Sequence, residues 1–365
     1  MTIPFVSLIE QYKEIQADIE EDVLYILRNC DFVGGHFVER FEKSLADFLG
    51  ANYAIGLSSG TDALMLAMEA LSIGPKDQVI VPVNSFIASA FAISRCGAKP
   101  LFVDVDPDSY LLDLEQVEKV IKKNKKVKAI MVVHLYGQMP DMEALVDLAK
   151  QRKVYLIEDG AQAIGATYNG KSLGFYSHIA TTSFYPTKNL GTCGQGGAVI
   201  VNDKTIADRV RTIANQGSRS KYEHTCMGGN YRLDSIMAAQ LYHALKKVPD
   251  WNTQRRRIAN HFNNTFTPSQ RPIERPNSRH SYHLYEYKCS STDMRNALAL
   301  RLKSWGIGFG FHYPTIITET PMYKDWAETP VAFDLSRRLI SLPMFPTMTE
   351  HQANQIVDSV MALPT

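Results

Sequence analysis

Residues 78–105 read QVIVPVNSFIASAFAISRCGAKPLFVDV, and this stretch decides the fold. The short apolar run from Gln78 to Pro82 predicts a strand, and the longer run from Ser85 to Cys96 predicts a helix. A second strand is predicted over Lys99 to Val105. This alternation is typical of parallel strands that are joined by helices and buried on both faces. The stretch therefore predicts one unit of an α/β layer.

The same alternation extends in both directions, from about residue 53 to residue 202. Further strands are predicted over 53–57, 128–135, 154–158, 180–184 and 198–202, and further helices over 62–71, 114–123, 142–152 and 205–215. The expected fold class is therefore α/β, with a mostly parallel sheet in a large domain. Ligands of such sheets collect at the carboxyl ends of the strands, which is where functional residues are expected.

The sequence on either side of this block is helical or mixed. An amphipathic helix is predicted where apolar residues recur at helical spacing, at Ile15, Ile19, Val23 and Ile26. Residues 233–248 and 252–262 predict two helices linked near Pro249. A strand over 282–288 and helices over 293–305 and 349–362 complete an α+β pattern. We therefore expect a large domain over residues 1–250 and a smaller C-terminal domain over residues 251–365.

The composition excludes several classes of protein. The chain has 365 residues, 45% of them hydrophobic, and its 39 lysines and arginines nearly balance its 38 aspartates and glutamates. This balance argues against nucleic acid or an anionic membrane as the main partner. No apolar run approaches the roughly 18 residues of a membrane span, and the first residues lack a targeting pattern, so we expect a cytoplasmic protein. The five cysteines form no close pair, which fits neither a disulfide framework nor a zinc site, and no metal is expected.

A lysine and an aspartate stand out at predicted strand ends. Lys188 lies in SFYPTKNLG (183–191), 29 residues after Asp159, which follows the predicted strand 154–158. A lysine amine beside a buried aspartate is what pyridoxal phosphate (PLP) requires. The amine forms a Schiff base with the cofactor aldehyde, and the carboxylate keeps the pyridine nitrogen protonated. The alternative is an exposed lysine and an aspartate that caps a helix.

A phosphate site is predicted at the start of the helix that follows residues 53–57. The segment SSGTD (58–62) offers free backbone N–H groups, a glycine at Gly60 and the hydroxyl of Thr61. Ser183 supplies a further hydroxyl from a neighbouring strand end. A plain helix cap is the alternative. Two more residues fit a bound ring: Gln162 to bond its hydroxyl and Phe86 to stack on its face, although Phe86 also suits core packing.

These segments resemble the nucleotide-sugar aminotransferases of the DegT/DnrJ/EryC1/StrS type, and the resemblance covers nearly the whole chain. The segments that carry it are SSGTDAL (58–64), VPVNSFIASAFAI (81–93), VHLYGQMPDM (133–142), EDGAQAIGA (158–166), SFYPTKNLG (183–191), GQGGAVIVND (194–203), NYRLD (230–234) and FHYP (311–314). The resemblance implies the PLP-dependent transferase fold type I, which is aspartate aminotransferase-like. It also implies a cofactor bound between the two chains of a homodimer.

The resemblance assigns roles to individual residues. Lys188 matches the Schiff-base lysine, Asp159 the partner of the pyridine nitrogen and Gln162 the glutamine near the ring hydroxyl. The phosphate ligands are matched by Gly60, Thr61 and Ser183, and the stacking aromatic by Phe86. Asn230 matches an asparagine that reaches the phosphate of the other subunit's cofactor. The sequence departs from many relatives at Gln195, where they carry an acidic residue, and at Gly160, where they carry alanine.

The resemblance also implies a reaction. Glutamate would be the amino donor and the ketone of a nucleotide-linked deoxy sugar the acceptor, and such amino sugars commonly enter lipopolysaccharide, O-antigen or other glycans. Residues expected at the substrate are Tyr185, Arg232, His312 and Tyr313, with the loop GSRSKYEH (217–224), although a basic loop is also compatible with simple solvation. This loop resembles relatives that act on 3-keto sugars more than relatives that act on 4-keto sugars, and the resemblance favours C3 as the aminated position. A PLP-dependent sugar lyase or dehydratase, and a catalytically silent regulatory protein of this fold, are the alternatives; the related dehydratases carry histidine in place of Lys188.

Overall fold

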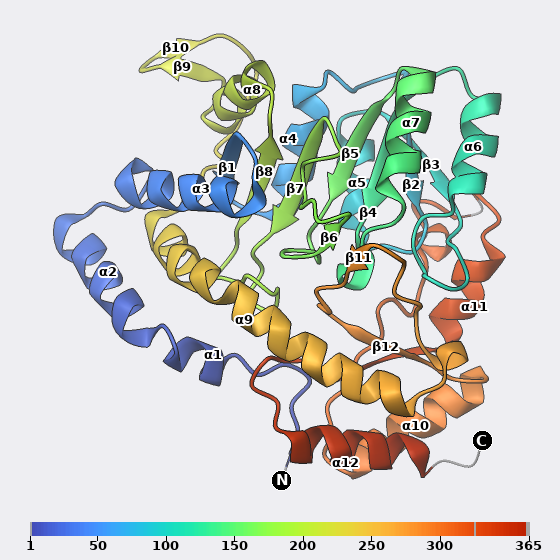
Figure 1. Ribbon diagram of the computed structural model, residues 1–365. Coiled ribbons are helices and arrows are strands. Elements are labelled where there is room, and N and C mark those ends of the chain that lie inside the picture. Colours follow the sequence, from blue (N-terminus) through green and yellow to red (C-terminus); the bar gives the residue numbers. More distant parts are fainter. Residues whose placement is uncertain (1, 325, 363–365) are drawn as a thin grey trace.

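The computed structural model describes residues 2–324 and 326–362, and its centre is a seven-stranded sheet (Figure 1). The strand order is β1-β8-β7-β5-β4-β2-β3. Every neighbouring pair is parallel except those that include β8, which is antiparallel to both of its neighbours. The strands are β1 (Tyr53–Leu57), β2 (Gln78–Pro82), β3 (Lys99–Val103), β4 (Val127–Val133), β5 (Tyr155–Asp159), β7 (Ile179–Ser183) and β8 (Gly197–Val201). The α/β fold class and the mostly parallel sheet are confirmed.

Helices cover both faces of this sheet, as the apolar character of the strands requires. Successive side chains of β2 show the arrangement, because Val79 and Val81 pack into one buried cluster and Ile80 into the other. One face carries α4 (Gly60–Ala70), α5 (Ala88–Arg95) and α8 (Lys204–Ala214). The other carries α2 (Gln16–Asn29), α3 (Gly35–Leu49), α6 (Leu114–Lys123), α7 (Met142–Arg152) and part of α9 (Ser235–Thr265).

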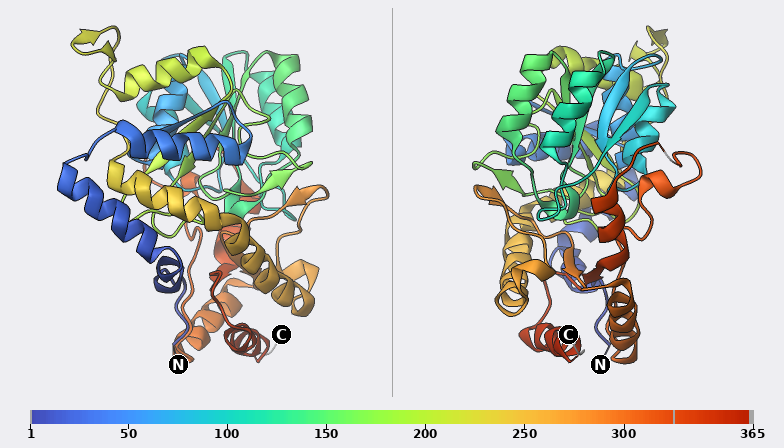
Figure 2. Two further views of the ribbon diagram at one scale, coloured as in Figure 1. Left: turned by 60° about the vertical axis from the view of Figure 1, so that its left-hand side comes forward. Right: turned by 90° about the vertical axis from the view of Figure 1, so that its right-hand side faces the viewer.

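The C-terminal part forms a third buried cluster around a two-stranded sheet. Strand β12 (Tyr285–Lys288) pairs antiparallel with β13 (Leu339–Leu342). Around it lie α10 (Thr292–Ser304), α11 (Pro330–Arg338) and α12 (Glu350–Met361). The N-terminal segment joins this part, because Ile3 pairs with Ile307 and is buried in the same cluster. Figure 2 shows both chain ends at this end of the molecule.

Helix α9 differs from the prediction of two helices linked near Pro249. It is a single helix of 31 residues with Pro249 inside it, and it runs from the sheet to the C-terminal part (Figure 1). An interior proline removes one backbone hydrogen bond. Burial of Leu245, Val248 and Trp251 on both sides of Pro249 holds the helix together across this gap. The expected division of the chain near residue 250 falls within this helix and stays a prediction.

Other differences concern short or unpredicted elements. The sequence patterns did not predict α1 (Ile9–Lys13), α3, α11 or β13. The predicted helix from Ser85 begins only at Ala88, which leaves Phe86 in a loop, and the strand predicted from Tyr282 begins at Tyr285. Small additional elements are the hairpin β9 (Ser218–Ser220) and β10 (Glu223–His224), the pair β6 (Thr167–Tyr168) and β11 (Ser278–Arg279), and the turns η1 (Leu135–Gly137), η2 (Pro268–Gln270) and η3 (Ile317–Glu319). None of the helices within the described residues has the length and apolarity needed to cross a membrane.

Candidate active site

The predicted site residues lie at one edge of the sheet, where the parallel strands end. Asp159 is the last residue of β5 and Ser183 the last of β7, while Ser58 directly follows β1. Strands β5 and β7 are neighbours, and Gly197 of β8 lies opposite both Leu57 and Ser183. The carboxyl ends of parallel strands meet at the same edge of a sheet. The fold therefore brings together residues that are more than 120 positions apart in the sequence.

Asp159 is held as a fixed hydrogen-bond acceptor. It is 4% exposed, and one carboxylate oxygen accepts a hydrogen bond from the Ser89 hydroxyl at 2.7 Å. The other oxygen accepts from the backbone N–H of Ala161 at 3.1 Å. Two donors fix the orientation of the carboxylate and support its charge, as the partner of a pyridinium nitrogen requires.

Lys188 lies on the turn that follows β7, close enough to Asp159 to interact with its charge. Burial lowers the pKa of the Lys188 amine from 10.5 to about 8, although the negative charge of Asp159 opposes the shift. The next residue, Asn189, anchors the turn by donating to the Asn252 side chain at 2.8 Å and to the Ser281 carbonyl at 2.9 Å. Lys188 is thus an amine with a large neutral fraction near pH 8, and the hydrogen bonds of Asn189 hold its turn in place.

The N-terminus of α4 forms a close contact with the end of β7. A Cβ atom at Gly60 would lie 2.6 Å from the Cβ of Ser183, so only glycine allows this approach. The Ser59 hydroxyl caps the helix by accepting from the Asp62 N–H at 3.1 Å. Part of the segment therefore acts as the helix cap that was the alternative prediction. The first turn of α4, with Thr61 and the neighbouring Ser183 hydroxyl, has N–H and O–H groups of the kind that binds phosphate at helix N-termini.

Gln162 connects two tyrosines beside this site. Its side-chain oxygen accepts from the Tyr136 N–H at 2.6 Å, and its amide donates to the Tyr313 hydroxyl at 3.2 Å. Burial raises the pKa of Tyr313, and the charge of Asp159 adds to this effect. Phe86 is 56% exposed with its ring centroid 5.8 Å from that of Tyr313, so it lies outside the core and its face is open to a ligand.

The remaining predicted residues differ in how far they are exposed to solvent. His312 is partly buried, and burial together with the positive charge of Lys188 lowers its pKa to about 4. Tyr185 is exposed at the turn that carries Lys188. Asn230 is exposed, although the following Tyr231 carbonyl accepts from the Ser58 N–H at 2.9 Å. The Arg232 guanidinium bonds the Asn215 side chain at 2.5 Å, and no bond joins it to the other predicted substrate residues in the described part of the chain.

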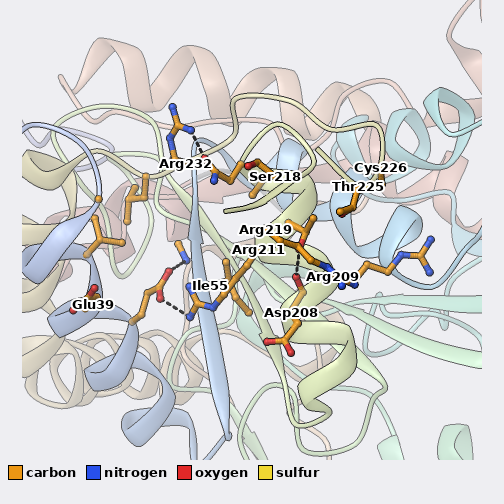
Figure 3. Close-up of a pocket in the computed structure, with 18 of the residues that line it drawn as sticks. Glu39, Ile55, Asp208, Arg209, Arg211, Ser218, Arg219, Thr225, Cys226 and Arg232 are labelled. Atoms are coloured by element: carbon orange, nitrogen blue, oxygen red, sulfur yellow. Dashed lines mark hydrogen bonds and ion pairs between the residues drawn. The ribbon is translucent and has the colours of Figure 1, made fainter. Parts of the chain in front are cut away.

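Arg232 instead lines an open hollow of about 1050 Å³ between α3, α8 and the β9–β10 hairpin (Figure 3). Four arginines contribute to its wall: Arg209, Arg211, Arg219 and Arg232. Arg211 pairs at 2.6 Å with Glu42, whose pKa is raised by burial. Lys188 and Asp159 do not line the hollow, so it is separate from the group at the sheet edge.

Sequence reasoning missed several residues that support this group. Ser89 lies within the quoted segment 81–93, yet nothing in the local pattern indicates that it bonds Asp159, 70 positions away. Glu158 forms a buried 2.7 Å contact with His134, whose backbone N–H donates to the Asp159 carbonyl at 3.0 Å. The sequence offered one signal for this contact, because His134 and Glu158 are polar residues within the apolar segments 128–135 and 154–158. Among residues 2–324 and 326–362, no cluster of His, Cys, Asp and Glu is arranged to hold a metal ion.

The group at the sheet edge fits PLP in its chemistry. It has an amine that is partly neutral near pH 8, a buried carboxylate with two donors, and a helix N-terminus where Gly60 lies against Ser183, and PLP uses groups of these three kinds.

Comparison with known proteins gives a consistent result. The model of the DegT/DnrJ/EryC1/StrS aminotransferase family matches residues 13–361. A protein of Geobacillus stearothermophilus named pleiotropic regulatory protein is 38% identical over 99% of this chain and 98% of its own. The dTDP-3-amino-3,4,6-trideoxy-alpha-D-glucose transaminase of Streptomyces venezuelae is 37% identical over 98% of this chain and 95% of its own. The crystal structure of S. venezuelae DesV in complex with a ketimine intermediate has a TM-score of 0.94 at 36% identity, and the match covers 98% of this chain and 97% of that one.

Proposed function

The chain belongs to the DegT/DnrJ/EryC1/StrS aminotransferase family, which is PLP-dependent, and from this premise we propose its donor, its acceptor and the roles of its residues. The proposed reaction transfers an amino group from glutamate to the C3 keto group of a nucleotide-linked deoxy sugar. The observation that carries it is the Lys188 amine beside the Asp159 carboxylate at the sheet edge. A lysine at this position favours transamination over the dehydration carried out by histidine-bearing relatives.

Each residue has a proposed task in this reaction. When bound, PLP would supply a carbon that takes up the amino group and a ring that stores the electron pair left behind when a base removes the proton. Lys188 accepts that proton at Nζ and returns it, once for the donor and once for the sugar. Asp159 holds its negative charge toward the ring nitrogen, with Ser89 keeping the carboxylate in place. The first turn of α4 and Ser183 bind the phosphate, and Gln162 and Phe86 position the ring.

The preference for C3 rests on the loop at residues 217–224 and gains support from the S. venezuelae relative, whose name specifies a 3-amino sugar. Amination at C4 remains the alternative acceptor position. The distinguishing experiment incubates the enzyme with glutamate and either a 3-keto or a 4-keto dTDP-deoxy sugar, followed by mass detection of the amine. We expect the amine from the 3-keto substrate. Amine from the 4-keto substrate alone would replace C3 by C4, and amine from neither would contradict the sugar acceptor.

We further propose a homodimer in which Asn230 of one chain completes the phosphate site of the other. The Asn230 side chain is exposed. Large apolar side chains are also exposed nearby, with Tyr222 84% and Met227 91% exposed in the segment that includes the projecting β9–β10 hairpin (Figure 1). Such exposure in a folded chain favours burial against a partner. A second copy of the chain is the partner that this site requires.

Subunit mixing tests the shared site. Lys188→Ala and Asn230→Ala variants are each purified, then mixed under conditions that exchange subunits. If Asn230 serves the partner's site, each hybrid dimer contains one site with both residues intact, so activity recovers. If Asn230 serves its own chain, every hybrid site lacks one residue and the mixture stays as inactive as its components.

A further inference from the structure

Glu286 is a buried carboxyl group that has no task in the proposed reaction. It lies in β12 directly opposite Ser341 of β13 and is 1% exposed. One carboxyl oxygen lies 2.5 Å from the Ser341 hydroxyl, and the other has no hydrogen-bond partner in the described part of the chain. A buried carboxyl without a cationic partner is costly, so its presence calls for a role.

The Ser341 hydroxyl links Glu286 to the wall of the active site. It lies 2.6 Å from Nδ1 of His312, the residue that precedes Tyr313. The imidazole stacks on Phe5 with ring centroids 5.6 Å apart, and the His312 carbonyl accepts from the Tyr136 hydroxyl at 2.6 Å. His312 is therefore fixed in place, and its Nε2 has no hydrogen-bond partner among the described residues, nor is that atom among the fully buried ones.

The Ser341 hydroxyl has a single proton, so it can donate a hydrogen bond either to Glu286 or to Nδ1 of His312, but not to both. If Glu286 is ionised, Ser341 donates to it and must accept from Nδ1–H of His312, which leaves Nε2 as an acceptor. If Glu286 holds a proton, it donates to Ser341, and Ser341 donates to Nδ1. The ring then carries its proton on Nε2. Going from the first state to the second, Glu286 takes up one proton from solvent, and the proton of the His312 ring moves from Nδ1 to Nε2.

We propose that Glu286 is a positioning residue that acts through Ser341 to set which ring nitrogen of His312 carries the proton. The inference rests on the proposed function in one respect: the state of Nε2 decides whether His312 accepts from or donates to a bound substrate. Its test on His312 itself is independent of that function.

The surroundings place this change near neutral pH. Burial raises the pKa of Glu286 to about 8. The titratable groups that face it are the phenols of Tyr110, Tyr136 and Tyr313, whose own pKa values are raised first by burial and further by Glu286. These neutral groups give the carboxylate no countercharge. Burial and the positive charge of Lys188 keep the pKa of His312 near 4, so the ring stays neutral and only its tautomer changes.

The test is the ¹⁵N NMR spectrum of the holoenzyme labelled at its ten histidines, recorded from pH 6 to pH 9. The His312 signals are assigned by their loss in His312→Asn. In the native protein we expect the protonated nitrogen to change from Nε2 at low pH to Nδ1 at high pH. A His312 tautomer that is constant over this range would overturn the proposal.

Three variants locate the cause. Glu286→Gln keeps the shape of the side chain but cannot titrate, so His312 should hold one tautomer at every pH. Ser341→Ala should likewise remove the pH dependence, whereas Ser341→Thr keeps the hydroxyl and should retain it. A pH-dependent tautomer that persists in Glu286→Gln or in Ser341→Ala would refute the role of the missing group.

The pH profile of kcat/KM gives a second readout. Glu286→Gln should lose an inflection near pH 8 that Ser341→Thr retains. The two proposals fail separately, because a tautomer change in a protein that aminates no keto sugar would overturn the proposed function and leave this inference standing.

Discussion

The sheet edge that holds Lys188 and Asp159 is built differently from the β12–β13 wall, by which we mean Glu286 of β12, Ser341 of β13 and the adjoining His312. At the sheet edge, Asp159 ends a parallel strand and Lys188 lies on the turn that follows the neighbouring one, so backbone topology brings the groups together. At the β12–β13 wall, a chain of side-chain contacts joins Glu286, Ser341 and His312. In our proposals the sheet edge supplies the chemistry, and the β12–β13 wall sets which ring nitrogen of His312 carries the proton toward a substrate. Substitutions in the two regions should therefore differ in size and in kind.

The largest expected effect comes from Lys188→Ala. The variant loses both the attachment point for PLP and the proton carrier, so kcat should fall by at least about 10⁴-fold. Steady-state turnover with glutamate and a keto sugar nucleotide measures it. Lys119→Ala, at a well-exposed lysine of α6, is the matched control and should keep native activity. Native activity in Lys188→Ala would rule out its assigned role.

Asp159→Asn should have the next largest effect. It preserves the shape but removes a buried charge that opposes a cation, a loss of roughly 3–5 kcal/mol or about 10²- to 10⁴-fold in rate. The same turnover assay measures it, with Asp250→Asn on the exposed surface as the control. A loss below about tenfold would mean that the charge of Asp159 is not required.

The pH dependence of cofactor capture should follow the Lys188 amine. Only the neutral amine reacts, and its pKa is lowered to about 8, so protonation suppresses capture as the pH falls. The rate at which apoenzyme takes up PLP should rise about tenfold per pH unit below pH 8 and level off above it. Stopped-flow absorbance measures this rate. A rise that continues to pH 10 would show an amine with its ordinary pKa.

Ser89→Ala tests how much the support of Asp159 contributes. The variant removes one hydrogen bond of 2.7 Å to a charged group, worth about 1.5–3 kcal/mol, so kcat should fall by roughly 10- to 100-fold. Ser85→Ala, which removes the hydroxyl that contacts Ser89 rather than Asp159, should lose less. Equal losses in the two variants would contradict a specific role for the bond to Asp159.

The two regions also differ in how far the sequence predicted them. The seven strands of the sheet were predicted because β-branched runs such as 78–82 and 154–158 alternate with helical runs. Asp159 and Lys188 followed from their places at strand ends. The bond of Ser89 to Asp159 and the contact of Glu286 with Ser341 were not predictable, because they join residues 70 and 55 positions apart. Helix α3 was missed despite Phe37, Phe41 and Leu45 at helical spacing, and the continuity of α9 depends on tertiary burial around Pro249.

The β12–β13 wall is expected to show its effect in the pH dependence of stability rather than in turnover. In the unfolded chain Glu286 loses its proton near its ordinary value of 4.5, whereas the native state keeps it until about pH 8. Between these values the native state binds the extra proton, so stability falls as the pH rises, by up to about 1.4 kcal/mol per pH unit. Glu286→Gln lacks this dependence. Urea unfolding of both proteins at pH 5 and pH 7.5 measures it, and equal changes with pH in the two would contradict a raised pKa for Glu286.

The central claim, that Lys188 and Asp159 form the catalytic centre of a PLP-dependent aminotransferase, is tested most directly by absorption spectroscopy. The purified protein is loaded with PLP, its spectrum is recorded, and glutamate is added. The prediction is a visible band of lysine-bound cofactor that glutamate converts to the near-ultraviolet band of the amine form, with no lysine-bound band in Lys188→Ala. A native protein that gains no band with PLP, or whose band is unchanged by every amino donor supplied, would contradict it.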